Sequence, residues 1–151
     1  MEKRRINVRA IVWHEGKLLA VKHKNDDGTP QPYWALPGGG LDPMESLETG
    51  VQREVMEELG VDAEIGRLLG GQQFPSGRDD FDEELEFFFE VKYRPEFETV
   101  DLAATSHGAD ELADIAFVDP RAVPIKPELL ATLEIEALLT QDTFVEVANN
   151  L

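Results

Sequence analysis

The sequence predicts a layered α/β architecture of the mixed (α+β) kind. Short runs with apolar residues at every second position recur along the chain between polar turns, and two segments of helical periodicity alternate with them. The length of 151 residues and the 42% apolar content are typical of a globular chain with a core of its own. We therefore expect a single domain that spans residues 1–151.

The N-terminal part predicts three strands before the first helix. Apolar residues alternate with polar ones over 6–12, which indicates a strand. A turn at 14–17 leads to a return strand over 18–23, and we expect the two strands to form a hairpin. The turn-rich segment 25–32 predicts a loop, and a short strand over 33–36 follows it.

Residues 46–59 predict the main helix. Ser46 is a favourable N-cap, and Gly60 is the residue type expected just after a last helical turn. Residues spaced by four form an apolar stripe, which predicts the buried face: Val51, Val55 and Leu59.

The C-terminal half predicts three more strands and a second helix. Two segments lack such patterns: 74–82 reads as a polar loop, and 95–110 as a long loop or a mobile lid. Pro127 is expected at the first position of a Leu-rich helix over 128–139. The strands are predicted over 63–72, 84–93 and 115–118.

The most specific feature is the pattern G-x5-E-x7-R-E-U-x-E-E-x-G-U, in which U is an aliphatic residue, over 39–61. On a helix, Glu54, Glu57 and Glu58 stand at i, i+3 and i+4, so their carboxylates are neighbours that repel one another. A divalent cation would remove that repulsion. Because the available ligands are oxygen atoms, we expect Mg²⁺ first and Mn²⁺ second.

A solvated acidic face is the alternative interpretation of such a helix. The preceding segment 37–40, Pro-Gly-Gly-Gly, favours a ligand site, because glycine lets a ligand approach the backbone closely. Arg53 can hold the neighbouring carboxylates in place through its planar guanidinium, a structural role more than a catalytic one. Glu45 would either bind a metal through water or brace the loop.

This pattern resembles the Nudix box, the signature of hydrolases that cleave nucleoside diphosphates linked to another moiety. The resemblance implies the Nudix fold, a mixed β-sheet sandwiched between α-helices, and metal-assisted hydrolysis of a phosphoanhydride bond. It also implies that Glu54, Glu57 and Glu58, helped by the carbonyl of Gly39, carry the metal. Among these, Glu57 and Glu58 are the candidates for a direct part in the chemistry, with Arg53 beside them.

A base must accept a proton from the attacking water. Enzymes of the family use a box glutamate or a glutamate on a later loop, and Glu111, just before the last predicted strand, is our candidate for the second role. A helix-start or surface acid is the alternative interpretation of Glu111. Glu84 and Glu86 are weaker candidates, because the alternation of their strand could direct them out of the site. His107 lies in the expected lid.

Two positions outside the strict motif depart from what the family often carries. Met44 stands where a glycine often precedes the first box glutamate. Gly50 stands inside the helix where alanine is frequent, which is expected to cost about 1 kcal/mol of helix propensity.

The substrate is less well defined by the sequence. Trp34 and Phe74 could stack on a base, with a core position as the alternative, and Arg78 could pair with a phosphate or a ribose, with a solvated loop arginine as the alternative. The chain suits a nucleoside triphosphate or sugar-nucleotide hydrolase. A catalytically silent, nucleotide-binding regulatory module is the other function class, and the complete set of box acids favours the enzyme.

The composition limits the partners. A formal net charge of −17 argues against nucleic-acid binding, which depends on Lys and Arg. No run approaches the roughly eighteen apolar residues that span a membrane. The absence of cysteine excludes disulfides and thiolate metal sites, and no signal peptide is apparent. We expect a cytoplasmic monomer or homodimer with a small nucleotide substrate.

Overall fold

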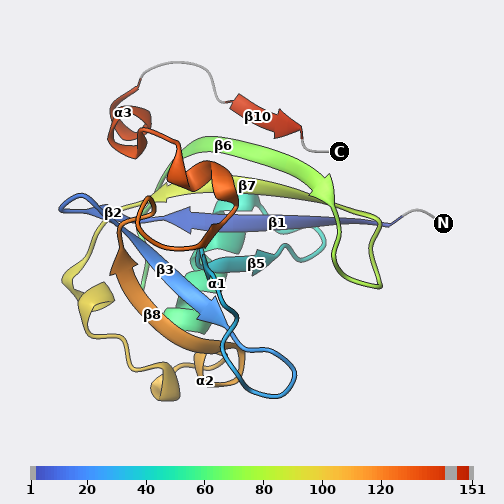
Figure 1. The fold of residues 1–151 in the computed structure, drawn as a ribbon, viewed down its shortest axis with the longest axis horizontal. Coiled ribbons are helices and arrows are strands. Elements are labelled where there is room, and N and C mark those ends of the chain that lie inside the picture. The colour runs from blue at the N-terminus through green and yellow to red at the C-terminus, as the bar shows by residue number, and fades with distance from the viewer. Residues whose placement is uncertain (1–2, 142–145, 150–151) are drawn as a thin grey trace.

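The structure is a computed structural model that describes residues 3–141 and 146–149. Strands are the commonest regular element of the chain, and one long helix accompanies them (Figure 1). In chain order the elements are β1 (Arg4–Ile11), β2 (Trp13–His14), β3 (Lys17–His23), β4 (Trp34–Ala35), β5 (Gly38–Gly40), α1 (Leu47–Leu59), β6 (Ile65–Pro75), β7 (Glu83–Val91), η1 (Pro95–Glu98), η2 (Leu102–Ala104), α2 (Gly108–Glu111), β8 (Leu112–Val118), β9 (Ile125–Lys126), η3 (Glu128–Ala131), α3 (Ile135–Thr140) and β10 (Glu146–Asn149).

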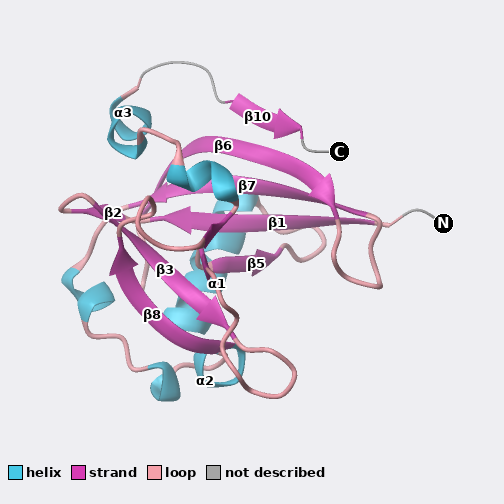
Figure 2. Cartoon of the chain, in the orientation of Figure 1, coloured by secondary structure: helices cyan, strands magenta, loops and turns pink. Residues whose placement is uncertain are grey.

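The strands form two five-stranded sheets (Figure 2). The first has the order β10-β6-β7-β1-β5, in which β1 runs parallel to β7 and antiparallel to β5. The second has the order β2-β3-β4-β9, with β8 antiparallel to β3. Parallel and antiparallel pairs share a sheet, so the predicted mixed α+β class is confirmed. No helix in the described residues combines the length and apolarity needed to cross a bilayer.

Separate hydrophobic cores lie on the two faces of β1. Val8 and Ala10 face α1 and pack against its apolar stripe. The neighbouring Ile11 belongs to a second cluster, together with Leu130 of η3 and Ile135 of α3. The sheet therefore lies between α1, which runs behind the strands in Figure 1, and the cluster that Leu130 of η3 and Ile135 of α3 form with Ile11.

Helix α1 forms as predicted. The Oγ of Ser46 accepts a hydrogen bond from the backbone N–H of Thr49 at 3.2 Å, which caps the first turn. Gly60 ends the helix in the left-handed conformation, with φ of 68°. The predicted apolar stripe is buried: Val51, Val55 and Leu59.

The predicted N-terminal hairpin is wrong in its extent. Only the two residues of β2 pair with the start of β3, whereas β1 pairs with β5 and β7. The parallel pairing of β1 with β7 extends from Arg4 opposite Glu83 to Ile11 opposite Glu90. This long pairing places β1 and β3 in different sheets, and the chain passes between the sheets at Val12.

The predicted helix over 128–139 is also wrong, because the chain forms η3 and α3 with a break between them. Thr132 lies at the break, and both its backbone N–H and its hydroxyl donate to the carbonyl of Leu129. Leu130 and Ile135 are both buried in one cluster, although a spacing of five would place them on different faces of a straight helix. Pro127 precedes η3 as its N-cap, one position before the expected one.

Other predicted boundaries shift by a few residues. The strand predicted over 115–118 begins earlier than expected, at Leu112 (β8), and β6 extends to Pro75, into the segment predicted as a loop. The segment 95–110, predicted as a loop or lid, contains two short 3-10 helices and the start of α2. It is docked on the end of α1, where the backbone N–H of His107 donates to the carbonyl of Glu57 at 2.9 Å.

Candidate active site

The box acids of α1 face the glycine strand β5. A side chain at Gly39 would bring its Cβ to 2.8 Å from Oε1 of Glu54, so the glycine leaves room for this carboxylate in its present position. One residue earlier, the N–H of Gly38 donates to Oε2 of Glu58 at 3.1 Å. Glu54 is 8% exposed and Glu58 only 1%. The strand and the helix thus enclose two buried carboxylates.

Burial makes these two acids hard to ionise. Loss of solvent raises the pKa of Glu58 to about 8, against the opposing effects of the Arg9 charge and the Gly38 N–H. Burial likewise raises the pKa of Glu54, against the opposing effect of Arg53. The negative charge of Glu111 contributes to both increases, which places this residue within electrostatic reach of the pair.

The guanidinium of Arg53 contacts three of the box glutamates. Its Nε and Nη2 donate to the two carboxylate oxygens of Glu45, at 2.7 and 2.9 Å. Its Nη1 lies 3.0 Å from Oε1 of Glu54 and 3.1 Å from Oε2 of Glu57. A last bond, from Nη2 to the carbonyl of Gly40 at 2.9 Å, fixes the guanidinium to the glycine strand. Arg53 therefore acts as an internal counterion, and Glu45 braces it.

Glu57 and Glu111 lie on the side of the site that faces α2. Oε2 of Glu57 lies 3.1 Å from Nδ1 of His107, the residue that precedes α2. Glu111 is the last residue of α2, and its side chain is exposed. Its backbone carbonyl accepts from the N–H of Lys24 at 2.9 Å, which ties the end of α2 to the end of β3.

As the side chains stand, no group of three His, Cys, Asp or Glu residues in the described part of the chain is arranged to hold a metal ion. The donor set still fits a hard divalent cation. Glu54 and Glu58 are buried carboxylates that offer oxygen donors, and the absence of a side chain at Gly39 leaves room beside Glu54. Occupation would require Glu57 to turn away from Arg53 and His107 toward the other two carboxylates.

A cavity of about 810 Å³ adjoins this site. Arg9 joins the two, because it lines the cavity and its Nη1 donates to the carbonyl of Gly38 at 2.8 Å. Of the residues predicted to bind substrate, Phe74 and Arg78 line the cavity. Trp34 does not; it packs against the second core cluster, with Nζ of Lys22 at 4.9 Å from the centre of its ring.

The aromatic side chain that lines the cavity next to β4 is that of Tyr33, the residue just before the strand. Sequence reasoning missed it, because a strand of two residues is too short for its alternation to show which neighbour faces a site. Phe74 lines the cavity as well, so two aromatic rings are available to a base.

The floor of the cavity is built from β1 and β7. Glu84 accepts hydrogen bonds from Asn7 and Ser76, and Glu86 accepts from Arg9 and Gln72. Both acids line the cavity that adjoins the box acids. The sequence carried a signal for this floor that we did not use: polar residues alternate along both strands, at Arg5, Asn7 and Arg9 and at Glu84 and Glu86.

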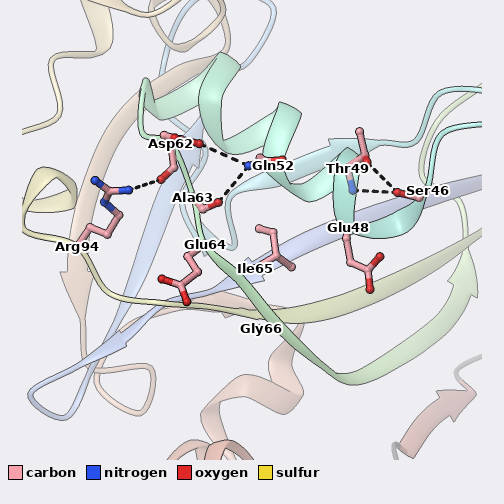
Figure 3. A pocket seen from close by; sticks show the side chains of 10 residues that line it. All are labelled: Ser46, Glu48, Thr49, Gln52, Asp62, Ala63, Glu64, Ile65, Gly66 and Arg94. Atoms are coloured by element: carbon pink, nitrogen blue, oxygen red, sulfur yellow. Dashed lines mark hydrogen bonds between the residues drawn. The ribbon is translucent and has the colours of Figure 1, made fainter.

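A second hollow, of about 590 Å³, lies between the outer side of α1 and the start of β6 (Figure 3). Gln52 crosses it and donates to Asp62 and to the carbonyl of Ala63. Arg94 donates to the carbonyl of Asp62 from the opposite side. None of the residues that line this hollow is a box glutamate, so the candidate chemistry belongs to the first cavity.

Comparison with known families agrees with this geometry. A model of the NUDIX domain matches residues 3–138. The chain belongs to the Nudix family. Among curated relatives of this Nudix domain, a MutT-like protein of Streptomyces ambofaciens is 47% identical over 60 residues, which are 40% of this chain and 36% of the relative. A putative 8-oxo-dGTP diphosphatase of Bacillus subtilis is 39% identical over 80 residues, 52% of this chain and 48% of the relative. The chain thus matches less than half the length of these relatives.

Solved structures share the fold of this Nudix domain. The solution structure of the E. coli ORF135 protein superposes with a TM-score of 0.68 at 18% identity and covers 95% of this chain and 96% of that one. The crystal structure of an ADP-ribose pyrophosphatase from Streptococcus suis has a TM-score of 0.66 at 21% identity and covers 95% and 98%. The expected Nudix fold is therefore confirmed.

The two departures from common Nudix sequences have different structural settings. A Cβ at Gly50 would lie 2.5 Å from Cδ1 of Leu41 and 3.3 Å from Cγ2 of Val8, so the glycine allows α1 to pack closely on its neighbours. Met44 is fully exposed and has φ of 65°, in the left-handed region that favours glycine. Gly50 is thus explained by packing, whereas Met44 carries backbone strain.

Proposed function

We propose that this chain is a divalent-metal-dependent hydrolase of a phosphoanhydride bond in a nucleoside diphosphate linked to another moiety, with a nucleoside triphosphate or a sugar nucleotide as substrate. Mg²⁺ is the expected ion, and Mn²⁺ the second choice. The curated relatives extend beyond the region that this chain matches, so their names alone do not assign its activity. The proposal therefore combines family membership with the geometry of the site.

One observation carries the proposal. Glu58 is 1% exposed, and its carboxylate accepts a hydrogen bond from the backbone N–H of Gly38. A buried carboxylate without a matching cation destabilises a fold, so its presence calls for a positive partner. Glu54, beside Gly39, is also buried but has Nη1 of Arg53 at 3.0 Å, and a divalent cation between the two carboxylates would neutralise the charge that remains.

The side chains divide the work. Glu54, Glu57 and Glu58, with the carbonyl of Gly39, would hold the cation. When bound, the ion would supply a Lewis acid for the negative charge on the phosphates and for water. Arg53 orients the carboxylates from behind. A water molecule attacks phosphorus, the bond from phosphorus to the bridging oxygen breaks, and a carboxylate accepts the proton of the water; Glu111 is the candidate for this base.

A panel of nucleotides with millimolar Mg²⁺, followed by chromatography of the products, tests the proposal. We expect turnover that stops in excess chelator and returns with Mg²⁺. Glu54→Gln and Glu58→Gln should each lower kcat by more than about tenfold, a ΔΔG‡ above roughly 1.4 kcal/mol, with an intact fold. Glu64→Gln, at an exposed position beyond α1, is the matched control.

Full turnover in chelator would overturn the proposal. Nucleotide binding by the wild type without any turnover would assign the chain to the silent regulatory class instead.

A further inference from the structure

Positive charge gathers in the cavity of an otherwise acidic chain. The sequence has 14 Lys and Arg against 31 Asp and Glu, yet Arg5, Arg9, Arg78 and Lys126 all line this one cavity. Two of the four are already engaged. Nε of Arg9 donates to Glu86 at 2.6 Å, and the ammonium of Lys126 lies 4.4 Å from the centre of an aromatic ring. The charges left to act on a ligand are those of Arg5 and Arg78.

Neither of these guanidiniums has a full ion-pair partner among the residues that the structure describes. The side chain of Arg78 makes no hydrogen bond or salt bridge there. Its hydrogen bonds are those of the backbone: its N–H donates to Oγ of Ser76 at 3.1 Å, and its carbonyl accepts from the N–H of Phe81 at 3.3 Å. Nη1 of Arg5 lies 3.7 Å from Oε2 of Glu84, a long contact. That carboxylate also accepts hydrogen bonds from Asn7 and Ser76, so it is shared.

Arg5 and Arg78 also act on each other. The pKa of Arg5 is lowered, first by burial and then by the positive charge of Arg78. Two like charges in a partly buried cavity repel each other more than they would in water, because the surroundings screen them less. An anion between them would convert this repulsion into two attractive contacts.

Arg5 lies beside the glycine strand of the box. A Cβ at Gly40 would be 3.1 Å from Nη2 of Arg5, and a Cβ at the preceding Gly39 would be 2.8 Å from the Glu54 carboxylate. Because successive residues of a strand face opposite sides, Arg5 lies on the cavity side of β5 and Glu54 on the side of α1. The charge of Glu54 is among those that oppose the lowering of the Arg5 pKa, so the guanidinium is within electrostatic reach of the candidate metal ligands.

We infer that Arg5 and Arg78 together bind a phosphate group of the substrate other than the two joined by the bond that is cleaved. This inference rests on the proposed function. Guanidinium groups present paired N–H donors that match phosphate oxygens, and two of them on one phosphate make charge-assisted hydrogen bonds from both sides. The additional phosphate belongs either to a longer polyphosphate chain or to the ribose. A nucleotide sugar with a neutral sugar lacks it.

Steady-state kinetics with four adenine nucleotides separate these sources. ATP carries the additional phosphate in its chain and NADPH on its ribose, whereas ADP-glucose and NADH carry none. Arg5→Gln and Arg78→Gln should each raise KM about tenfold or more for the substrate that carries the recognised phosphate and leave ADP-glucose and NADH unchanged. Arg78→Lys keeps the charge without the planar donors and should give an intermediate KM.

Arg4→Gln is the matched control, because Arg4 precedes Arg5 on the same strand, is 55% exposed and forms an ion pair with Glu83. It removes the same charge and should not change KM. A selective effect on ATP assigns the chain phosphate, and one on NADPH the ribose phosphate. An equal change for all four substrates, or none, would overturn the inference.

Binding of inorganic tripolyphosphate without metal, measured by calorimetry, provides a readout that is independent of turnover. We expect the wild type and Arg4→Gln to bind it and both Arg5→Gln and Arg78→Gln to lose binding. If the wild type hydrolyses no nucleotide but this binding pattern holds, the proposed function fails and the arginine pair stands. If nucleotides are hydrolysed and the wild type and both variants behave alike, the arginine pair fails and the proposed function stands.

Discussion

The backbone N–H of Gly38 donates to the carboxylate of Glu58 at 3.1 Å, and this bond joins two residues that are twenty apart in the chain. It holds the last box glutamate against the glycine strand, out of contact with solvent. The stability of the metal-free fold and the reactivity of the site therefore depend on the same buried group.

We predict that Glu58→Gln stabilises the metal-free protein at alkaline pH. The pKa of Glu58 is raised from 4.5 to about 8 in the folded chain. Between these values the folded state retains a proton that the unfolded chain releases, so the free energy of unfolding falls as pH rises from about 4.5 to about 8. Glutamine cannot ionise, and at pH 9 the gain should be on the order of 2–4 kcal/mol.

Urea unfolding in chelator at pH 4.5 and pH 9 measures this difference, with Glu64→Gln as the control at an exposed position. The two proteins should be nearly equal in stability at the lower pH. A Glu58→Gln variant that is less stable than the wild type at pH 9 would show that ionisation of the buried carboxyl group does not destabilise the fold.

Gly39→Ala should weaken metal use without unfolding the protein. The added Cβ would lie 2.8 Å from a carboxylate oxygen of Glu54, and the flexible end of this side chain can move aside. The Mg²⁺ concentration for half-maximal activity should rise about tenfold, the effect of a displaced ligand worth roughly 1.4 kcal/mol. Gly77→Ala is the control, because nothing lies within 4 Å of its Cβ. An unchanged Mg²⁺ requirement would exclude Glu54 as a ligand.

Glu111→Gln should lower kcat by about two to four orders of magnitude, the usual range for a general base. KM should change little, because the base acts on the water. Asp110→Asn, at the preceding exposed position of α2, is the control. Wild-type kcat in Glu111→Gln would assign the proton transfer to a box glutamate.

Met44→Gly should stabilise the protein. Met44 has φ of 65° and makes no use of its exposed side chain in packing, so glycine relieves the strain at no cost in contacts. The greater freedom of glycine in the unfolded chain offsets part of the gain, and we expect about 0.5–1 kcal/mol. Thermal unfolding measures it, and an equal or lower midpoint would mean that the loop tolerates methionine without strain.

The sequence was sufficient for the parts of the site that are local in the chain. Helix α1 forms as expected. Its ends follow from the residue types at Ser46 and Gly60, and the neighbouring positions of the box glutamates follow from helical periodicity. The contact of Arg53 with Glu57 could be foreseen from the same periodicity, since the two residues stand at i and i+4.

The cavity could not be foreseen, because it depends on which strands are adjacent. Arg5 lies opposite Glu84 only because β1 pairs with β7, and alternation along either strand does not reveal this partner. Competition for a backbone carbonyl explains why the helix predicted over 128–139 is broken. The hydroxyl of Thr132 takes the carbonyl of Leu129, and the periodicity of leucines does not show that bond.

The pairing of β1 with β7 also bears on the order of events during folding. Arg9 and Glu86, which meet in the floor of the cavity, are separated by 77 positions, as are Asn7 and Glu84. Closing so long a loop is entropically costly and slow, whereas a helix such as α1 forms from neighbouring residues. During synthesis, the floor of the cavity therefore cannot form until β7 has emerged. Chains that stop before Glu83 carry the full set of box acids but lack this floor.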